Sequence, residues 1–255
     1  MKKLFVVLIT LILLSLSACK EVPSPIDVVS IDYPSIKCLK EGTFSPEVES
    51  KWWYPQNPYH NYVSSVSVVN GQLYLGNQAE SSQSYLQCFD NGYFMGVDIG
   101  EFDGWVKYCP YFSLLPEAGS EKLVSEQNCR GIIARDHRKG YILTSQSLYA
   151  MNCENENYQW EWRLIESFDN GVRTYLYLKE QDVLYVVTAG SIVSVSADFQ
   201  TTTIVESEIL RYMETNSIVF YEGSLWCGGA TGVYRYCFET DEERWYPVDY
   251  AKYVK

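Results

Sequence analysis

The stretch Asn216–Pro247, NSIVFYEGSLWCGGATGVYRYCFETDEERWYP, contains four short runs in which apolar positions alternate. Gly223, Gly229, Gly232 and the acidic run at 239–242 separate these runs. Alternation with a period of two is typical of β-strands, and glycine or acidic residues between them are typical of tight turns. The stretch therefore predicts a sheet of four antiparallel strands, which needs neighbours because it cannot bury its two faces alone.

Similar runs recur upstream, over residues 62–100, 131–168 and 172–205. The first of them contains two Asn-Gly pairs, at 70–71 and 91–92, each flanked by apolar alternation that favours a hairpin. The second strands align on one apolar position per repeat, with spacings of 69, 42 and 41: Leu73, Ile142, Leu184 and Leu225. Two of these spacings match a propeller blade of about forty residues. We predict a single-domain, all-β fold, a β-propeller of four or five four-stranded antiparallel blades.

A family resemblance supports this fold. The segment 223–229, GSLWCGG, followed by 231–236, TGVYRY, is similar to the repeat of bacterial two-component-regulator propellers. The match covers one repeat well and residues 70–88 moderately, and the second and third repeats lose one of its glycine-like positions. No helical signalling segment follows. The resemblance thus implies the fold and leaves the activity open, since propellers host unrelated functions.

The long first spacing leaves extra residues between the first and second repeats. We interpret residues 101–128 as an insertion or a degenerate blade, with 114–127 as the only helix candidate. The fragment KWWYP at 51–55 echoes ERWYP at 243–247. Because closed propellers often join their two chain ends in one sheet, these fragments are predicted to meet.

The first residues have the pattern of an export signal. Lys2 and Lys3 precede an apolar run, 4–14, that is too short for a membrane-spanning helix of about 20 residues. The next residues, LSAC at 16–19, resemble the lipobox of bacterial lipoproteins. That resemblance implies cleavage before Cys19 and attachment of a diacylglyceryl group to its thiol, often with acylation, for example by palmitate, of the new amine. An ordinary signal peptide with a chance cysteine is the alternative.

These signals divide the chain into three parts. Residues 1–18 are predicted to be a lipoprotein signal peptide, residues 19–40 the lipidated cysteine with a proline-containing tether, and residues 41–255 the propeller domain. Several acyl chains together pass the threshold for stable membrane anchoring. Lys20 stands where the resemblance places an aspartate for inner-membrane retention, so we expect the outer membrane, facing the periplasm or the cell surface.

The charge of the chain is strongly acidic. It is −12 at pH 7 and becomes about −14 when Lys2 and Lys3 leave with the signal peptide. This balance argues against nucleic acid as a partner and against adhesion to anionic lipid headgroups. Solubility is one explanation, and a basic partner is another.

Eight cysteines in an exported chain favour oxidation over metal binding. With Cys19 lipidated an odd number remains, so at least one thiol is free or intermolecular. Cys109 and Cys129 bracket the extra segment and are the disulfide candidates. Cys88 and Cys237 align at one third-strand position of different blades, too far apart to pair. Cys227 replaces Leu75 of the first repeat and is interpreted as a small buried hydrophobe.

No motif for catalysis or for a metal accompanies these features. His60 and His137 are the only histidines, and each lies in a polar, turn-like setting without a nucleophile motif. No Cys-x-x-Cys pair occurs, so we expect no metal and no cofactor. Carboxylates are plentiful, yet the sequence does not place any two at the separation a glycosidase needs.

The main hypothesis is a non-catalytic propeller in the cell envelope that binds a protein or a glycan, with unknown ligand-binding residues. A second hypothesis is an acidic inhibitor or immunity-type protein directed against a basic toxin. The third is a carbohydrate-active enzyme, which would need carboxylates that converge in the central funnel and have shifted pKa values.

Overall fold

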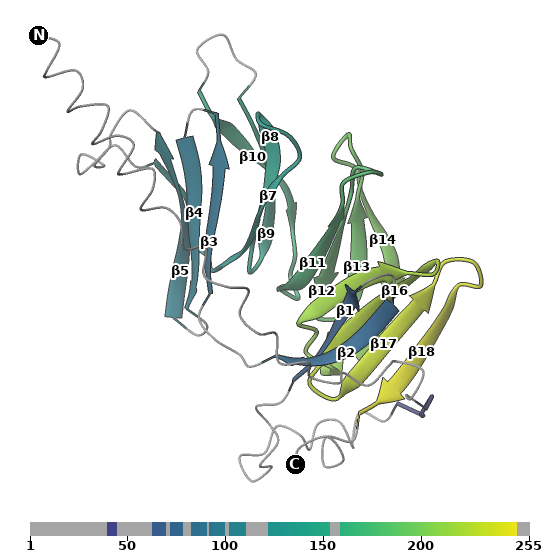
Figure 1. The fold of residues 1–255 in the computed structure, drawn as a ribbon. Coiled ribbons are helices and arrows are strands. Elements are labelled where there is room, and N and C mark those ends of the chain that lie inside the picture. Colours follow the sequence, from purple (N-terminus) through teal and green to yellow (C-terminus); the bar gives the residue numbers. More distant parts are fainter. Residues whose placement is uncertain are drawn as a thin grey trace, which may run out of the picture. The chain divides into compact units, whose positions relative to one another are not determined.

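The computed structural model describes residues 40–44, 63–69, 72–78, 83–90, 92–99, 102–110, 122–153 and 159–248. The chain divides into two units, residues 1–33 and 34–255, and all of the described residues belong to the second. Their regular structure is almost entirely antiparallel β-sheet (Figure 1).

The described strands form four four-stranded sheets and one hairpin, and each of these follows chain order. The hairpin consists of β1 (Val63–Val69) and β2 (Gln72–Gln78). The first sheet contains β3 (Gln83–Phe89), β4 (Gly92–Ile99), β5 (Phe102–Pro110) and β6 (Lys122–Ser125). The second contains β7 (Cys129–Ala134), β8 (Lys139–Thr144), β9 (Ser147–Asn152) and β10 (Glu161–Ser167).

The third sheet contains β11 (Val172–Leu178), β12 (Val183–Thr188), β13 (Ser191–Val195) and β14 (Thr201–Glu206). A short helix, α3 (Glu208–Tyr212), leads to the fourth, which contains β15 (Ser217–Tyr221), β16 (Ser224–Gly229), β17 (Gly232–Cys237) and β18 (Glu242–Pro247). The last three sheets coincide with the predicted repeats 131–168, 172–205 and 216–247.

Successive sheets are packed through their first strands. Strand β3 contacts β7, β7 contacts β11, β11 contacts β15, and β15 contacts β1 of the hairpin. The first strand of each sheet is therefore an inner strand that meets its counterpart in the next sheet. Together with the meander order of every sheet, this confirms the predicted β-propeller of four-stranded blades.

The core lies between neighbouring sheets and not at one centre. One cluster joins the first and second sheets, the next joins the second and third, and another joins the third and fourth. A smaller cluster holds Val66 and Leu73 of the hairpin against Trp226 and Val233 of the fourth sheet. Since side chains alternate along a strand, Tyr141 of β8 faces the third sheet while Ile142 faces the first. A sheet between two neighbours is therefore buried on both faces.

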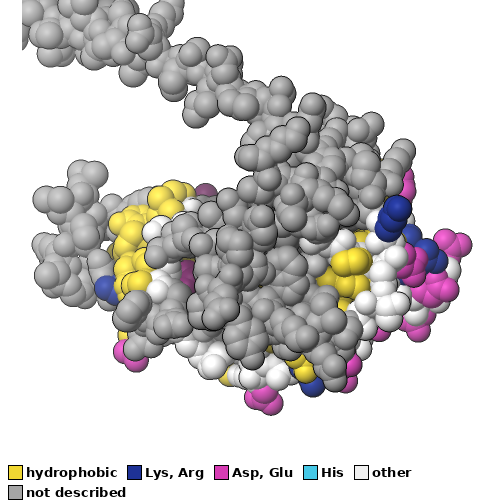
Figure 2. Space-filling model, turned by 90° about the horizontal axis from the view of Figure 1, so that it is seen from below, with side chains coloured by type: hydrophobic (Ala, Val, Ile, Leu, Met, Phe, Trp, Pro, Cys, Tyr) yellow, Lys and Arg dark blue, Asp and Glu magenta, His cyan; other side chains and the backbone are white. Residues whose placement is uncertain are grey.

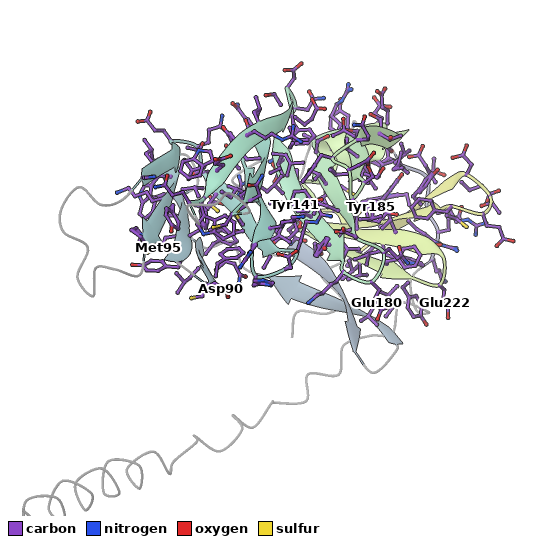
Figure 3. All side chains as sticks on the ribbon, turned by 90° about the horizontal axis from the view of Figure 1, so that it is seen from above. Asp90, Met95, Tyr141, Glu180, Tyr185 and Glu222 are labelled. Carbon is purple, nitrogen blue, oxygen red and sulfur yellow. The ribbon has the colours of Figure 1, made fainter. Side chains whose placement is uncertain are left out.

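The meander order also assigns each turn to one of two ends of the blades. Turns that join first to second strands lie at one end, and in Figure 3 three of them, at Asp90, Glu180 and Glu222, line the same side. Turns that join second to third strands lie at the opposite end, with the connections from one sheet to the next. The two ends therefore present different loops to solvent.

The prediction for residues 62–128 is wrong in its boundaries. Residues 62–100 were assigned to one sheet, but β1 and β2 form a separate hairpin, and β3 and β4 begin the first four-stranded sheet. The extra segment 101–128 supplies β5 and β6 of that sheet, so an insertion or a separate blade does not describe it. Of the helix candidate 114–127, residues 122–125 form strand β6 and residues 126–127 form a bend, whereas residues 114–121 lie outside the described residues.

The early part of the domain does reach β18, the last strand that the structure describes. Gly42 donates its main-chain N–H to the carbonyl oxygen of Trp245 on β18 over 2.9 Å, and the ring of Phe44 packs edge-on against Trp245 with centroids 5.7 Å apart. The predicted partner of β18, residues 51–55, lies outside the described residues.

The two sides of the molecule differ in surface character. Figure 2 shows hydrophobic side chains on the side of the first sheet, whereas the side of the fourth carries both hydrophobic side chains and a group of charged ones. On the first sheet, Leu86 of β3 is 65% exposed and Ile99 of β4 is 38% exposed. Within the described part of the chain, no helix has the length and the apolar character needed to span a membrane.

Candidate functional site

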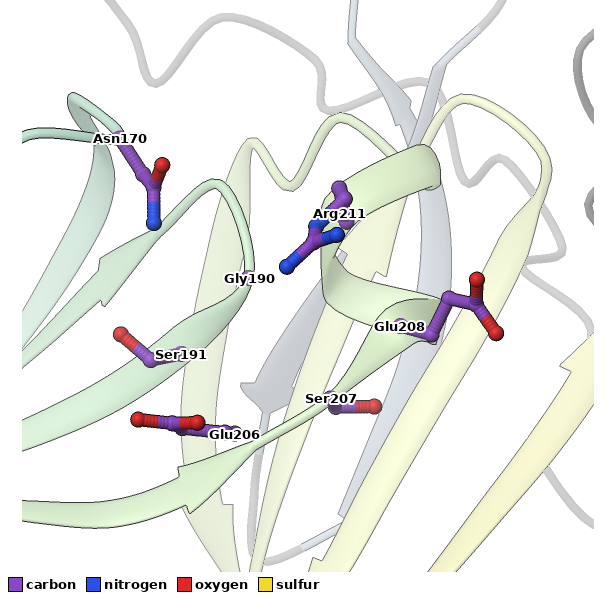
Figure 4. A pocket seen from close by; sticks show the side chains of 7 residues that line it. All are labelled: Asn170, Gly190, Ser191, Glu206, Ser207, Glu208 and Arg211. Atoms are coloured by element: carbon purple, nitrogen blue, oxygen red, sulfur yellow. The ribbon is translucent and has the colours of Figure 1, made fainter.

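A polar pocket lies at the end of the third sheet, where second-to-third turns and inter-sheet connections meet (Figure 4). Its volume is about 350 Å³. Three chain segments form its walls, which are the β10–β11 turn, the β12–β13 turn, and the end of β14 with α3. The lining residues are Asn170, Gly190, Ser191, Glu206, Ser207, Glu208 and Arg211.

Main-chain hydrogen bonds join the three walls to one another. Ala189 N donates to Gly171 O over 3.2 Å, which connects the two turns. Ser207 N donates to Gly190 O over 2.8 Å, which connects the β12–β13 turn to the start of α3. The walls therefore hold a fixed spacing that does not depend on a ligand.

The β12–β13 turn is built by Thr188 and Gly190. Thr188 Oγ1 accepts a hydrogen bond from Ser191 N over 3.1 Å and lies 2.7 Å from Ser191 Oγ. Gly190 has a φ of +130°, a conformation that residues with a Cβ avoid. A Cβ at this position would lie 3.7 Å from Arg211 Nε, an ordinary contact distance, so the positive φ and not the available space favours glycine here.

Helix α3 positions Arg211. Ser207 is its N-cap and accepts a hydrogen bond from Ile209 N over 3.2 Å. Leu210 and Met213 are fully buried in the cluster between the third and fourth sheets, so they fix the rotation of the helix. Arg211 consequently extends over the hollow, and within the described part of the chain it has no hydrogen bond and no ion pair.

The side chains of the pocket differ in direction. In Figure 4, Asn170 and Arg211 point toward the hollow from opposite sides, Ser191 and Glu206 extend in one direction below them, and Ser207 and Glu208 point away. Glu206 stands directly opposite Ser191 in the register of β13 and β14, so these two side chains are neighbours on one wall. The pocket thus offers hydrogen-bond donors with one carboxylate beside them.

A second polar cluster lies among the inner strands and contains Asp98 and Arg130. These two residues form an ion pair between β4 and β7 in which Asp98 is 7% exposed. Tyr85 of β3 and Tyr175 of β11 lie close by, and burial raises the pKa of both phenols above their ordinary value. Burial also raises the pKa of Cys129 to about 12. A thiol with that pKa is protonated at neutral pH and is a poor nucleophile.

The predicted disulfide between Cys109 and Cys129 is absent from this structure, in which both residues are buried. The alternation along β5 gives the reason. Tyr108 packs in the cluster that contains Cys129, so the next residue, Cys109, points to the opposite face of the sheet. Cys88 also departs from its alignment with Cys237, because it lies on the first strand of its sheet and Cys237 on the third strand of another.

Other sequence interpretations have structural counterparts. Cys227 is fully buried among apolar side chains, as predicted for a small hydrophobe. His137 is a turn residue whose side chain is 64% exposed, 3.9 Å from an Asp90 carboxylate oxygen. Cys19 and His60 lie outside the described residues. Among the residues that the structure describes, no group of three His, Cys, Asp or Glu side chains is placed to hold a metal ion.

Sequence reasoning missed the pocket residues. Asn170, Ser191 and Arg211 lie on three different connections, and no local pattern marks them as a set. One available signal was Ser207, because a serine directly before Glu208 is a typical N-cap and predicts the start of a helix there.

Comparison with known proteins gives the following. No family model matches the chain, and no curated protein matches it. Among solved structures, an auxiliary nutrient binding protein from Bacteroides thetaiotaomicron aligns with a TM-score of 0.37 and 14% identity, over 62% of this chain and 39% of that one. Virginiamycin B lyase from Staphylococcus aureus aligns with a TM-score of 0.42 and 9% identity, over 76% of this chain and 86% of that one.

A third similar structure is PorZ, a surface component of the type-IX secretion system of Porphyromonas gingivalis. It aligns with a TM-score of 0.38 and 12% identity, over 73% of this chain and 26% of that one. The chain therefore spans well under half the length of the nutrient binding protein and of PorZ.

Proposed function

We propose that this chain is a non-catalytic binding propeller of the bacterial cell envelope, attached to a membrane through lipid on Cys19, and that its ligand site is the polar pocket at the end of the third sheet. The observation that supports the binding function is the side chain of Arg211, which lines the pocket and has no hydrogen-bond or ion-pair partner among the described residues. A guanidinium without a partner, placed over a hollow whose walls are hydrogen-bonded to one another, is a preorganised recognition site.

The membrane attachment is supported by the sequence alone. The lipobox-like LSAC at 16–19 follows a basic and then an apolar segment of signal-peptide length. Lipid on Cys19 would hold the domain at a membrane surface without a spanning segment.

The absence of a catalytic role is supported by the chemistry of the two polar clusters. Neither cluster contains a histidine among the described residues, the Ser191 hydroxyl lies 2.7 Å from the hydroxyl of Thr188, and Cys129 is a buried thiol of raised pKa.

The test compares the unmodified chain with a variant whose pocket is filled. Both are purified from membranes in detergent and incubated with small-molecule extract of the cell envelope, and the retained compounds are identified by mass spectrometry. Asn170→Trp places a bulky ring at an exposed turn that borders the hollow. We expect at least one compound to be enriched on the unmodified chain and lost from the variant. Identical retained compounds on both chains would reject the pocket as the ligand site.

A further inference from the structure

We propose that the pocket binds a small carboxylate that carries a hydrogen-bond donor beside its carboxyl group. Amino acids, hydroxy acids and sugar acids share this chemistry. The inference rests on the proposed function, since it names the ligand class of the same pocket.

Arg211 is the carboxylate-binding group. A guanidinium presents parallel N–H donors that fit the two oxygens of a carboxylate, and such charge-assisted pairs are stronger than neutral hydrogen bonds. No described residue uses these donors. The amide of Asn170 points into the same space from the opposite wall (Figure 4), where it is able to donate a further hydrogen bond to the bound carboxylate.

Glu206 is the group that selects for a donor on the ligand. It is paired with Ser191 across β13 and β14, so the carboxylate and the hydroxyl lie side by side at the floor of the pocket. A ligand with a carboxylate and no hydrogen-bond donor would be repelled by the acidic side chain of Glu206, and no attractive contact with Glu206 would offset this repulsion. A neighbouring ammonium or hydroxyl group would instead donate to Glu206, which explains why a pocket for an anion contains an acid.

The rigid walls make this geometry specific. The bonds from Ala189 N to Gly171 O and from Ser207 N to Gly190 O fix the two turns and the start of α3 in one arrangement. Buried Leu210 and Met213 hold the helix that carries Arg211. Binding therefore costs little ordering of the main chain, and the affinity depends on whether the ligand matches both Arg211 and Glu206.

The experiment measures binding of four probes to the full chain in detergent by ligand-observed NMR and by calorimetry. The probes are alanine, lactate, glucuronate and, as the neutral counterpart of glucuronate, glucose. We expect at least one of the three carboxylates to bind and glucose to bind at least about tenfold more weakly. Which carboxylate binds best distinguishes an amino acid from a hydroxy acid and from a sugar acid.

Variants assign the binding to the two side chains. Arg211→Gln should weaken binding of the carboxylate by about tenfold or more. Arg211→Lys keeps the charge without the paired donors, so its affinity should lie between those of the unmodified chain and Arg211→Gln. Glu206→Gln should weaken the binding of alanine more than the binding of lactate, because the substitution removes the charged partner of the alanine ammonium group. Arg244→Gln, on β18 and outside the pocket, removes one positive charge just as Arg211→Gln does, and it should leave every affinity within about twofold.

Three results would overturn the ligand class. They are binding of glucose as tight as that of the best of the three carboxylates, equal binding of that carboxylate by the unmodified chain and by Arg211→Gln, and no binding of any of the three carboxylates. Each of these leaves the proposed function standing if the envelope extract still yields a compound that Asn170→Trp loses. If that extract also yields none, the pocket fails as a binding site altogether.

Discussion

The thiol of Cys237 illustrates how a few hydrogen bonds change the chemistry of one residue. The side chain of Thr240, followed by main-chain groups of Thr240 and Glu239, lowers the pKa of Cys237 to about 7. We expect iodoacetamide to label it with a half-maximal rate near pH 7. Thr240→Val should move this midpoint upwards, toward the ordinary thiol value of about 8.5.

The measurement is peptide mapping of the labelled chain over a pH series. Cys88 is an exposed thiol on another sheet and serves as the comparison, whereas the buried Cys129 should react only in denaturant. An unchanged midpoint for Cys237 in Thr240→Val would show that the hydrogen bond from Thr240 does not set its pKa.

A second residue-scale feature is the contact of Arg135 with Asp182, between the second and third sheets. Arg135 Nε donates to Asp182 Oδ1 over 2.9 Å, a second pair joins its Nη2 to Oδ2, and Tyr177 donates to Asp182 over 2.7 Å. Burial disfavours the ionised carboxylate, but these hydrogen bonds outweigh it and lower the pKa of Asp182. The ionised form therefore stabilises the folded state above the ordinary carboxyl pKa of about 4.

Asp182→Asn should accordingly lower the free energy of unfolding at pH 7 by about 1–2 kcal/mol. This value is below that of a fully buried pair, since the Asp182 side chain is 35% exposed. The difference should shrink as the pH falls through the lowered pKa, because the native carboxylate then becomes protonated. Urea unfolding over a pH series measures it. Asp169→Asn, at an exposed turn, is the control, and a difference that does not depend on pH would contradict the assignment.

At the scale of elements, the packing of inner strands depends on glycine. A Cβ at Gly131 of β7 would lie 2.3 Å from Cε1 of Tyr175 on β11, so this glycine lets the tyrosine ring cover its strand. Gly131→Ala should destabilise the fold by about 1–3 kcal/mol through overpacking. The same substitution should cost much less in a Tyr175→Ala background, because the ring is then absent.

A double-mutant cycle from urea unfolding of the four chains measures this coupling. A coupling energy near zero would mean that β7 and β11 do not touch at this point. The described packing of β7 against β11 would then be contradicted for these two blades.

The elements also show how far sequence reasoning reaches. Local alternation and glycine turns predicted every strand of the last three sheets, because each of those sheets is one uninterrupted meander. The two Asn-Gly pairs correctly marked the β1–β2 and β3–β4 hairpins. Whether two hairpins share a sheet depends on non-local pairing, which periodicity does not encode. The pairing of β5 with β4 therefore was not predicted, although its strand character is plain in 102–110.

The pocket shows the same limit more sharply. Asn170 and Arg211 are separated by a whole sheet in the sequence and meet because antiparallel strands return their connections to one end. Only the three-dimensional order of the strands brings them together. By contrast, the burial of Cys227 followed from its equivalence to Leu75, since that inference needed only the repeat.

At the scale of the whole molecule, the acidic charge and the proposed lipid anchor have complementary effects on membrane attachment. A chain of net charge −12 gains no attraction to anionic headgroups from its net charge. The acyl groups predicted on Cys19 would supply that affinity without requiring contact between the domain and the lipid. We expect Cys19→Ser to leave the membrane fraction as a soluble product or to persist as uncleaved precursor, which fractionation and immunoblotting distinguish.

Display of the binding propeller from a membrane is the central claim, and intact-mass spectrometry of the chain extracted from membranes tests it most directly. The predicted result is a chain that begins at Cys19 and carries the added mass of a diacylglyceryl group, with or without a further acyl chain. A chain that begins at another residue, or one that begins at Cys19 with an unmodified thiol, would contradict it.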